Sequence, residues 1–549
     1  MTSADLVLTG GAVWLGPGAA GHRAPVTHVA VAAGRIVALG DAEVTGLVGP
    51  GTRVVDLAGG LLVPGFQDSH VHPVQGGREL LSCNLADDAT EADYLRTVGG
   101  YAQRRTDLMW VTGGGWMLTA FAAGLPRREA LDSVVADRPV MLLNRDHHGA
   151  WVNSEALRRA GITAATADPP DGRVERDPDG SPTGMLHEGA MDLVARLVPD
   201  PTEAEQVDAL LTAQRYLHSV GVTAWQDAIL GSYANITDAS SAYARCADDG
   251  TLTARVVGAL WWDRSRGAEQ IDELVERRRE WTRGRFRPTS VKIMQDGIAE
   301  NFTAGMLRPY LDGSGGTTRN TGLSMVDPEA LCSHVAGLDA AGFQVHVHAI
   351  GDRAVREALD AFAAARQRNG PSDHRHHIAH LQVIHPDDID RFARLGVAAN
   401  LQPLWAAHED QMDDLTLPFL DAETARRQYP FGSLARAGAV LAAGSDWPVS
   451  SPNPLWGIHV AVNRQLPEAA GEVRAPFLPG QALGVEAALA AYTAGSAWVN
   501  HLDDTGCIRV GARADFALLD RDILSGPAAE IGTARVFATY VDGVEVFAS

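Results

Sequence analysis

The middle of the chain repeats one pattern, in which a short apolar run is followed by an alanine-rich helical stretch. Repeated β-then-α units predict a parallel sheet covered by helices, and this limits the fold more than any other feature. A closed (β/α)8 barrel and an open doubly wound sheet both satisfy the pattern. The apolar runs occupy residues 140–143, 222–225, 255–258, 291–294, 344–348 and 440–443.

The two ends of the chain instead contain short strands and turns. Paired apolar segments joined by glycine-containing turns predict three hairpins, at residues 6–14, 28–39 and 536–547. We expect the two ends to pair into one small β-sandwich domain, built from residues 1–63 and 505–549.

The stretch between about residues 76 and 201 is too long for a single connection inside residues 64–504, which form the predicted α/β domain. Its part from 168 to 184 is rich in proline, glycine and aspartate, which indicates an exposed excursion. We therefore predict an insertion here, after the first strand of the α/β domain, that caps the functional site.

Composition excludes several classes of protein. Of 549 residues, 46% are hydrophobic and 21% charged, as in a soluble protein of two or more domains. The net charge of −22 and the lack of a long basic stretch argue against nucleic acid or a membrane surface as partner. Four scattered cysteines favour neither a disulfide framework nor a cysteine-rich zinc site. Because no signal peptide or spanning segment is visible, we expect a cytoplasmic protein.

The segment from Pro64 to His72 ends in His-Val-His and is the first candidate for chemistry. Side chains alternate along a strand, so His70 and His72 project to the same side of one. Two such imidazoles are suited to one divalent metal, although a structural role is the alternative for an isolated pair.

Further polar residues lie at the ends of other predicted strands. Lys292 stands within an apolar strand, where it could extend to the rim, pair with Asp296, or react with CO2 to give a carbamate that bridges two metals. Four histidines, one lysine and one aspartate thus follow successive strands. A (β/α)8 barrel places its active site at this end of its strands, so these residues favour a TIM-like barrel over the open sheet. The aspartate and the later histidines are Asp446, His348 and His380.

These motifs resemble the amidohydrolase superfamily, and more narrowly amidohydrolase family 3, which includes N-substituted formamide deformylases. The resemblance covers nearly the whole chain and keeps the family's order of motifs. The matching segments are Pro64–His72, Asp146–Asn153, Thr183–Glu188, Lys292–Gly297, His348–Asp352, His380, Gly444–Asp446 and Gly511–Phe516.

The resemblance implies a metal site of one or two divalent ions, zinc first among them. His70, His72 and Asp446 would bind one metal, while His348 and His380 would bind a second. Lys292, as its N6-carboxylated form, would bridge the two. His148 and Asn153 match family residues of the capping insertion, and both are expected to bind the substrate.

The expected activity is hydrolysis of a carbon–nitrogen bond other than a peptide bond, in a small N-acyl or N-formyl amide. Asp446 would act as general base and then general acid, and His148 or His380 would stabilise the oxyanion. A deaminase of an exocyclic amine and a catalytically silent binding protein are the alternatives. A homodimer is left open, since relatives are often dimers. Aromatic residues expected to favour an apolar or aromatic substrate are Trp116, Trp151, Phe302, Trp405 and Trp447.

Overall fold

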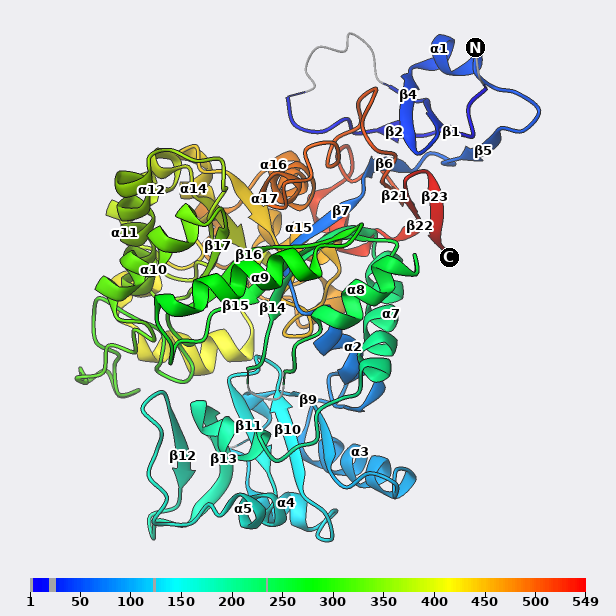
Figure 1. Ribbon diagram of the computed structural model, residues 1–549. Coiled ribbons are helices and arrows are strands. Elements are labelled where there is room, and N and C mark those ends of the chain that lie inside the picture. The colour runs from blue at the N-terminus through cyan, green and yellow to red at the C-terminus, as the bar shows by residue number, and fades with distance from the viewer. Residues whose placement is uncertain (1–2, 19–25, 122–124, 234–235) are drawn as a thin grey trace.

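The centre of the molecule is a parallel sheet of eight strands that curls into a nearly closed barrel (Figure 1). The computed structural model describes residues 3–18, 26–121, 125–233 and 236–549. The eight strands neighbour one another in chain order. They are β7 (Phe66–Val71), β14 (Val222–Leu230), β15 (Arg255–Trp261), β16 (Phe286–Met294), β17 (Gln344–Ala349), β18 (His377–His380), β19 (Ala398–Leu401) and β20 (Leu441–Ala443).

The first and last strands approach each other through side-chain and loop hydrogen bonds. The Ser69 hydroxyl donates to the carbonyl of Ala443 at 2.9 Å, and the Asp446 amide donates to the carbonyl of His70 at 2.8 Å. A Cβ on Gly444 would stand 2.6 Å from the backbone nitrogen of His70, so only glycine permits this approach. The barrel predicted from the sequence is confirmed.

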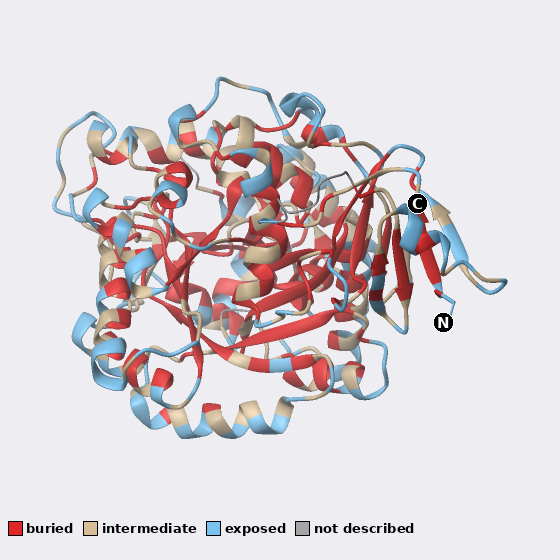
Figure 2. Cartoon of the chain, turned by 90° about the horizontal axis from the view of Figure 1, so that it is seen from above, coloured by how far each residue is buried: buried red, intermediate tan, exposed pale blue. Residues whose placement is uncertain are grey.

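Amphipathic helices surround the barrel, with their buried faces inward and their exposed faces outward (Figure 2). In α11 the buried residues recur every three or four positions, which is the spacing of one helical face. Among the described residues, no helix is both long and apolar enough to cross a membrane. The main helices are α2 (Pro73–Leu81), α7 (Glu203–Ser219), α8 (Ser240–Asp248), α9 (Ile271–Trp281), α10 (Pro328–Ala340), α11 (Asp352–Asn369), α12 (Pro386–Leu395), α14 (Phe431–Arg436), α15 (Pro454–Asn463), α16 (Val485–Ala490) and α17 (Ser496–Val499).

Strands from both ends of the chain lie together beside the barrel (Figure 1). One sheet has the order β4-β3-β1-β5 and the other the order β2-β6-β21-β22-β23, in which β21 pairs with β6. The predicted joining of the two termini is therefore confirmed. The strands are β1 (Leu6–Thr9), β2 (Ala12–Val13), β3 (Val29–Ala32), β4 (Arg35–Leu39), β5 (Arg53–Asp56), β6 (Leu61–Pro64), β21 (Phe516–Leu519), β22 (Val536–Val541) and β23 (Val544–Ala548).

The hairpins predicted at 28–39 and 536–547 are present as β3–β4 and β22–β23, but the one at 6–14 is wrong. β1 pairs with β3 and β5, whereas β2 pairs with β6 in the other sheet. The chain passes between the sheets at Gly10, where φ is +76°. A Cβ on Gly10 would collide with the Asp56 carboxylate, so this glycine serves a sheet crossing and not a hairpin turn.

The insertion forms a separate six-stranded sheet at one end of the barrel (Figure 1). The apolar run 140–143, which the sequence pattern grouped with the barrel units, is β10 of this sheet, because β9 and β11 are its partners. The elements are β8 (Cys83–Asn84), β9 (Val111–Trp116), β10 (Val140–Asn144), β11 (Gly149–Val152), β12 (Gly172–Arg176), β13 (Pro182–Glu188), α3 (Glu91–Arg104), α4 (Arg128–Asp132), α5 (Ser154–Ala160) and α6 (Asp192–Ala195). The exact domain boundaries stay a prediction.

Candidate metal centre

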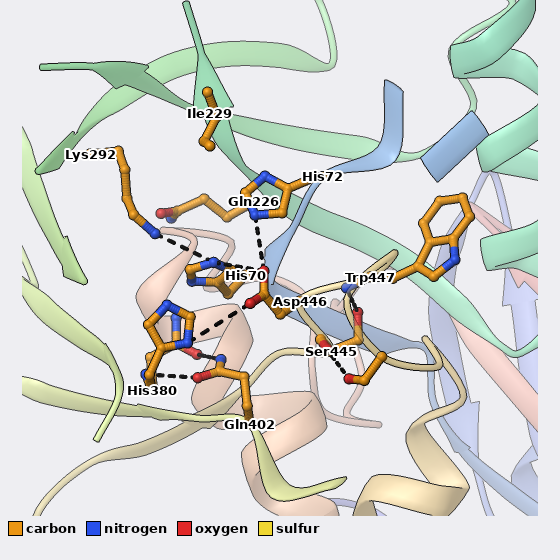
Figure 3. Close-up of polar contacts among 12 residues, drawn as sticks. His70, His72, Gln226, Ile229, Lys292, His380, Gln402, Ser445, Asp446 and Trp447 are labelled. Atoms are coloured by element: carbon orange, nitrogen blue, oxygen red, sulfur yellow. Dashed lines mark hydrogen bonds and ion pairs between the residues drawn. The ribbon is translucent and has the colours of Figure 1, made fainter. Parts of the chain in front are cut away.

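His70, His72 and Asp446 converge at the carboxyl end of the barrel (Figure 3). His70 is the next-to-last residue of the fully buried β7, and His72 follows that strand. The Nε2 atoms of His70 and His72 lie 3.1 and 2.9 Å from Asp446 Oδ1. One potential ligand atom from each of these three residues lies within 4.8 Å of the other two.

Asp446 follows the last barrel strand and is held by the loop around it. Its backbone is left-handed, with φ of +56°, a conformation that aspartate tolerates better than most residues. Ser445 beside it donates its hydroxyl to Asp68 at 2.5 Å. Burial raises the pKa of Asp68 to about 7, although the hydrogen bonds from Ser445 and from the His70 amide act to lower it. Asp68 thus ties the loop of Asp446 to the strand of His70.

The hydrogen bonding of this cluster is incomplete. Asp446 Oδ1 and His380 Nδ1 are buried and have no hydrogen-bond partner among the described residues. An unsatisfied buried acceptor costs about 1–3 kcal/mol, and more when it is charged. Burial acts to raise the pKa of Asp446, but His70 and His72 hold it well below its usual range, so the group is a carboxylate. A divalent cation fits this donor set, since it would satisfy the carboxylate and the imidazole nitrogens together.

Lys292 extends from β16 into the same cluster. Its Nζ lies 3.3 Å from His70 Nε2, and its side chain is buried. Burial lowers the pKa of Lys292 to about 7, against the opposing effect of Asp446. Lys292 is buried, so it does not extend to the rim of the barrel. It also does not pair with Asp296, because that carboxylate accepts from the amides of Ile350 and Gly351.

His348 and His380 complete the ring of side chains, from β17 and β18. Their ring centroids are 4.4 Å apart, and His380 Nδ1 lies 3.9 Å from Asp446 Oδ2. His348 Nε2 lies 3.2 Å from the carbonyl of Gly297. Burial holds the pKa of both imidazoles well below the usual value, so both are neutral. They border the compact group of His70, His72 and Asp446 without belonging to it.

Two histidine–carboxylate pairs from the insertion and α2 cover the cluster. His148 Nδ1 lies 2.9 Å from Glu188 Oε2, and His147 Nε2 lies 2.9 Å from Glu79 Oε1. Burial opposes protonation of His148, but Glu188 raises its pKa to about 9. The matched segments Asp146–Asn153 and Thr183–Glu188 contain His147 and Glu188, but only His148 was given a role from the sequence, and Glu79 lies in no matched segment. The adjacent histidines were visible, whereas their carboxylates lie far away in sequence.

The sequence matches the amidohydrolase family over residues 53–547. The chain belongs to the amidohydrolase family. Membership makes it a hydrolase, and the predicted family is confirmed.

Relatives of this amidohydrolase come from plants, bacteria and archaea. The protein named LONG AFTER FAR-RED 3 of Arabidopsis thaliana is 31% identical, over 99% of this chain and 92% of its own. An N-substituted formamide deformylase of Arthrobacter pascens is 26% identical over 94% of each chain. The crystal structure of an uncharacterized metal-dependent hydrolase from Pyrococcus furiosus has a TM-score of 0.70 and 25% identity, over 95% of this chain and 100% of that one.

A cavity of about 70 Å³ opens onto the cluster of this amidohydrolase. Of the predicted substrate-binding residues, His148 and Trp405 line it. The Trp405 ring is parallel to that of His380, with centroids 5.3 Å apart. Most of the remaining wall is apolar. Its apolar residues are Ile229, Ile236, Trp261, Met294, Ile298, Ile350 and Val449.

The structure assigns Trp116, Trp151 and Asn153 to the interior of the insertion, which corrects their predicted role in substrate binding. Both indoles are fully buried and donate to main-chain carbonyls, Trp116 to Leu142 and Trp151 to Arg127, at 2.9 Å each. Asn153 caps α5 by accepting from the Ala156 amide at 3.0 Å. Proximity to a motif in the sequence did not show whether a residue packs in a core or lines the cavity.

Phe302 and Trp447 are also absent from the described lining of the cavity. The Phe302 ring packs edge-on against Tyr310, with centroids 5.4 Å apart. Trp447 turns away from the cluster (Figure 3) and packs against Tyr216 at 5.3 Å. Both aromatic side chains therefore pack against other rings, and their role in substrate binding stays a prediction.

A second group of metal-ligand types lies before β18, at the other end of that strand from His380. It comprises Asp339, His374 and His376. His376 Nδ1 accepts from the Val345 amide at 3.0 Å, so the ring, when neutral, carries its proton on Nε2 and donates it to Asp339 at 3.0 Å. His376 Nε2, which carries the proton, therefore has no free lone pair for a metal. The group is a closed hydrogen-bond network.

Proposed function

We propose that this hydrolase cleaves the carbon–nitrogen bond of a small N-acyl or N-formyl amide that carries an apolar or aromatic group. The observation that carries the proposal is the convergence of His70, His72 and Asp446 on one point, with unsatisfied buried acceptors, beneath a mostly apolar cavity. The relative from Arthrobacter pascens, named as an N-substituted formamide deformylase, supports this bond type.

His70, His72 and Asp446 would hold one divalent metal, with zinc as the first candidate. His348 and His380 would hold a second, and a carbamate on Lys292 would bridge both. Because burial lowers the pKa of Lys292 to about 7, part of the buried amine is neutral at neutral pH and can add to CO2, losing one proton as the carbamate anion forms. When bound, a divalent metal makes water a better nucleophile at neutral pH and polarises a carbonyl oxygen.

Asp446 is the proposed general base. Because its pKa is held well below the usual range, it is ionised and can take a proton from the attacking water. The same carboxyl then delivers that proton to the leaving nitrogen, which would otherwise depart as a poor anionic leaving group. The rigid loop through Ser445 and Asp68 keeps the carboxylate in place for both transfers.

His148 is the proposed donor to the oxyanion. Its Nδ1 is engaged by Glu188, and its raised pKa of about 9 keeps the ring protonated at neutral pH. The Nε2–H therefore remains to donate to the substrate oxygen as negative charge develops there. His380, the other residue considered for this role, is a neutral imidazole whose Nδ1 has no hydrogen-bond partner in the described part of the chain, and it suits metal binding better.

The test combines metal analysis with a paired substrate screen. Purified protein is loaded with zinc, with and without bicarbonate, and its metal content is measured by elemental analysis. Uptake of one or two equivalents, together with release of amine from N-formyl or N-acyl amines, is the expected result. If the protein instead releases ammonia from exocyclic amines and leaves the amides intact, it is a deaminase and the proposal is wrong. Absence of bound metal under every loading condition would contradict it.

A further inference from the structure

A row of buried amides and imidazoles crosses the barrel interior beneath the candidate metal centre. Gln226 of β14 lies at its middle, and its side chain is drawn and labelled in Figure 3. Gln344 and His346 of β17 and His377 of β18 surround it, and all four residues are buried. None of them has a role in the chemistry described so far.

One end of this row is fixed by main-chain carbonyls. Gln344 Nε2 donates to the carbonyls of Arg375 at 2.9 Å and Val499 at 2.7 Å. Carbonyls only accept, so the other end of this amide, Oε1, must face Gln226. Gln226 Nε2 lies 2.9 Å from that oxygen and is therefore the donor. The carbonyl oxygen of Gln226 is then directed at the two imidazoles.

The position of the proton on each imidazole follows from this orientation. Gln226 Oε1 lies 2.8 Å from His346 Nδ1 and 3.1 Å from His377 Nε2, so both nitrogens carry hydrogen. A second set of hydrogen bonds, made by Asn400, gives the same proton position on His377. Asn400 Nδ2 donates to the carbonyl of Ser69 at 2.9 Å and to His377 Nδ1 at 3.1 Å, which leaves the proton of His377 on Nε2.

The row ends at a proposed metal ligand. His346 is fully buried and its ring nitrogens bond only an amide and an imidazole among the described residues, so it has no counter-ion and is neutral. With hydrogen on Nδ1, its Nε2 accepts from His70 Nδ1 at 2.9 Å. The lone pair of His70 is thereby placed on Nε2, the atom nearest Lys292 and Asp446.

We propose that Gln226 and His346 are positioning residues that hold His70 as its Nδ1–H tautomer and so present Nε2 to a divalent metal. The inference rests on the metal site of the proposed function. A metal-binding histidine generally donates its other ring N–H to a fixed acceptor, and loss of such a partner weakens metal binding about 10- to 100-fold. Here the acceptor is itself an imidazole, whose orientation is set from the base of the barrel.

The first experiment measures zinc affinity of the full-length apoprotein by competition with a chromophoric chelator. We expect Gln226→Met, which keeps side-chain length but removes both hydrogen-bonding ends, to weaken binding about 10-fold or more. Gln67→Met is the matched control, since Gln67 is equally buried in the barrel but bonds Thr505 and Asn500. The control should stay within about twofold of the parent. Unchanged affinity in a folded Gln226→Met protein, or equal losses in both variants, would overturn the inference.

A second pair of variants tests the acceptor itself. His346→Gln offers a carbonyl oxygen to His70 Nδ1–H, whereas His346→Phe offers a ring of similar shape without an acceptor. We expect the glutamine variant to bind zinc more tightly than the phenylalanine variant, with similar melting temperatures. Equal zinc affinities of the two variants would contradict the tautomer argument, whatever their stability.

A third measurement does not depend on metal. The ¹⁵N shifts of labelled histidine in the apoprotein distinguish the two tautomers, and the His346→Gln spectrum identifies the His346 signals by their loss. The expected result is hydrogen on Nδ1 of His346, and hydrogen on Nε2 would overturn the inference. If the parent binds no zinc, the proposed function fails, while this spectrum still decides the tautomer.

Discussion

Two clusters of two histidines and one aspartate lie in the part of the chain that the structure describes, and they differ in how completely they are hydrogen-bonded. Asp339 accepts from His374, His376, Ser372 and Asn369, so both carboxylate oxygens have donors. In the other cluster, Asp446 Oδ1 has two imidazole nitrogens nearby and no hydrogen-bond partner among the described residues.

This difference separates a structural network from a candidate metal site better than residue type does. A cation would gain little at the closed cluster, because both carboxylate oxygens of Asp339 and Nδ1 of His376 already accept hydrogen bonds. An open cluster of neutral imidazoles and a carboxylate carries a desolvation cost that a cation relieves. Asp446 also stands at the carboxyl ends of the strands, where barrels place their chemistry.

Asp446→Asn should have the largest effect on activity. The amide cannot take a proton from water at neutral pH, so we expect kcat for amide hydrolysis to fall by about 10³-fold or more. Steady-state kinetics with the amide found in the screen measure this loss. Asp339→Asn is the matched control and should keep kcat within about threefold. Comparable losses of kcat in both variants would erase the distinction between the clusters.

His148→Gln should have the next largest effect. Removal of one charged donor to an oxyanion typically lowers kcat by about 10²- to 10³-fold. The loss should appear in kcat more than in KM, because the interaction strengthens as charge develops. A change confined to KM would instead make His148 a ground-state binding residue.

Asp339→Asn should reduce stability without touching the metal. It removes charge-assisted hydrogen bonds from a buried network, so we expect the free energy of unfolding to fall by about 2 kcal/mol. Chemical denaturation measures this change, and zinc content measured alongside should match that of the parent. Loss of bound zinc in this variant would show that the closed cluster binds metal after all.

The pH dependence should give the smallest and most gradual effect. Glu188 raises the pKa of His148 to about 9, above its ordinary value of 6.5, so the pair stabilises the fold fully below about pH 6.5. That contribution is lost as pH rises through about 9, and activity should decline over the same range as the donor deprotonates. A flat rate profile from pH 7 to 10 would contradict the role of His148. The His148→Gln variant, which lacks this proton, is the control.

Much of the fold was predictable because its signals are local. The β-then-α repeats and the strand-end polar residues gave the barrel, and glycine-containing turns gave two of three hairpins. The crossing at Gly10 was not predictable, since a glycine between two apolar runs serves either a turn or a sheet crossing. The run 140–143 was grouped with the barrel strands because buried strands of the insertion and of the barrel are both short and apolar, so their sequences look alike.

The proposed ligands could be named from sequence, but the residues around them could not. Glu79 and Gln226 reach the site only through tertiary contacts, and no spacing in the sequence marks them. Glu188 lies in a matched segment, but its pairing with His148 could not be read from the sequence. The predictions for Trp116 and Trp151 failed for a related reason. Trp116 and Trp405 both lie near motifs, and only packing shows that the first fills a core while the second lines the cavity.

The most direct test of the central claim is anomalous diffraction at the zinc edge from crystals of zinc-loaded protein. The account predicts a peak within coordination distance, about 2.0–2.2 Å, of ligand atoms of His70, His72 and Asp446, and none beside Asp339. A peak beside Asp339, or no peak near Asp446, would contradict it.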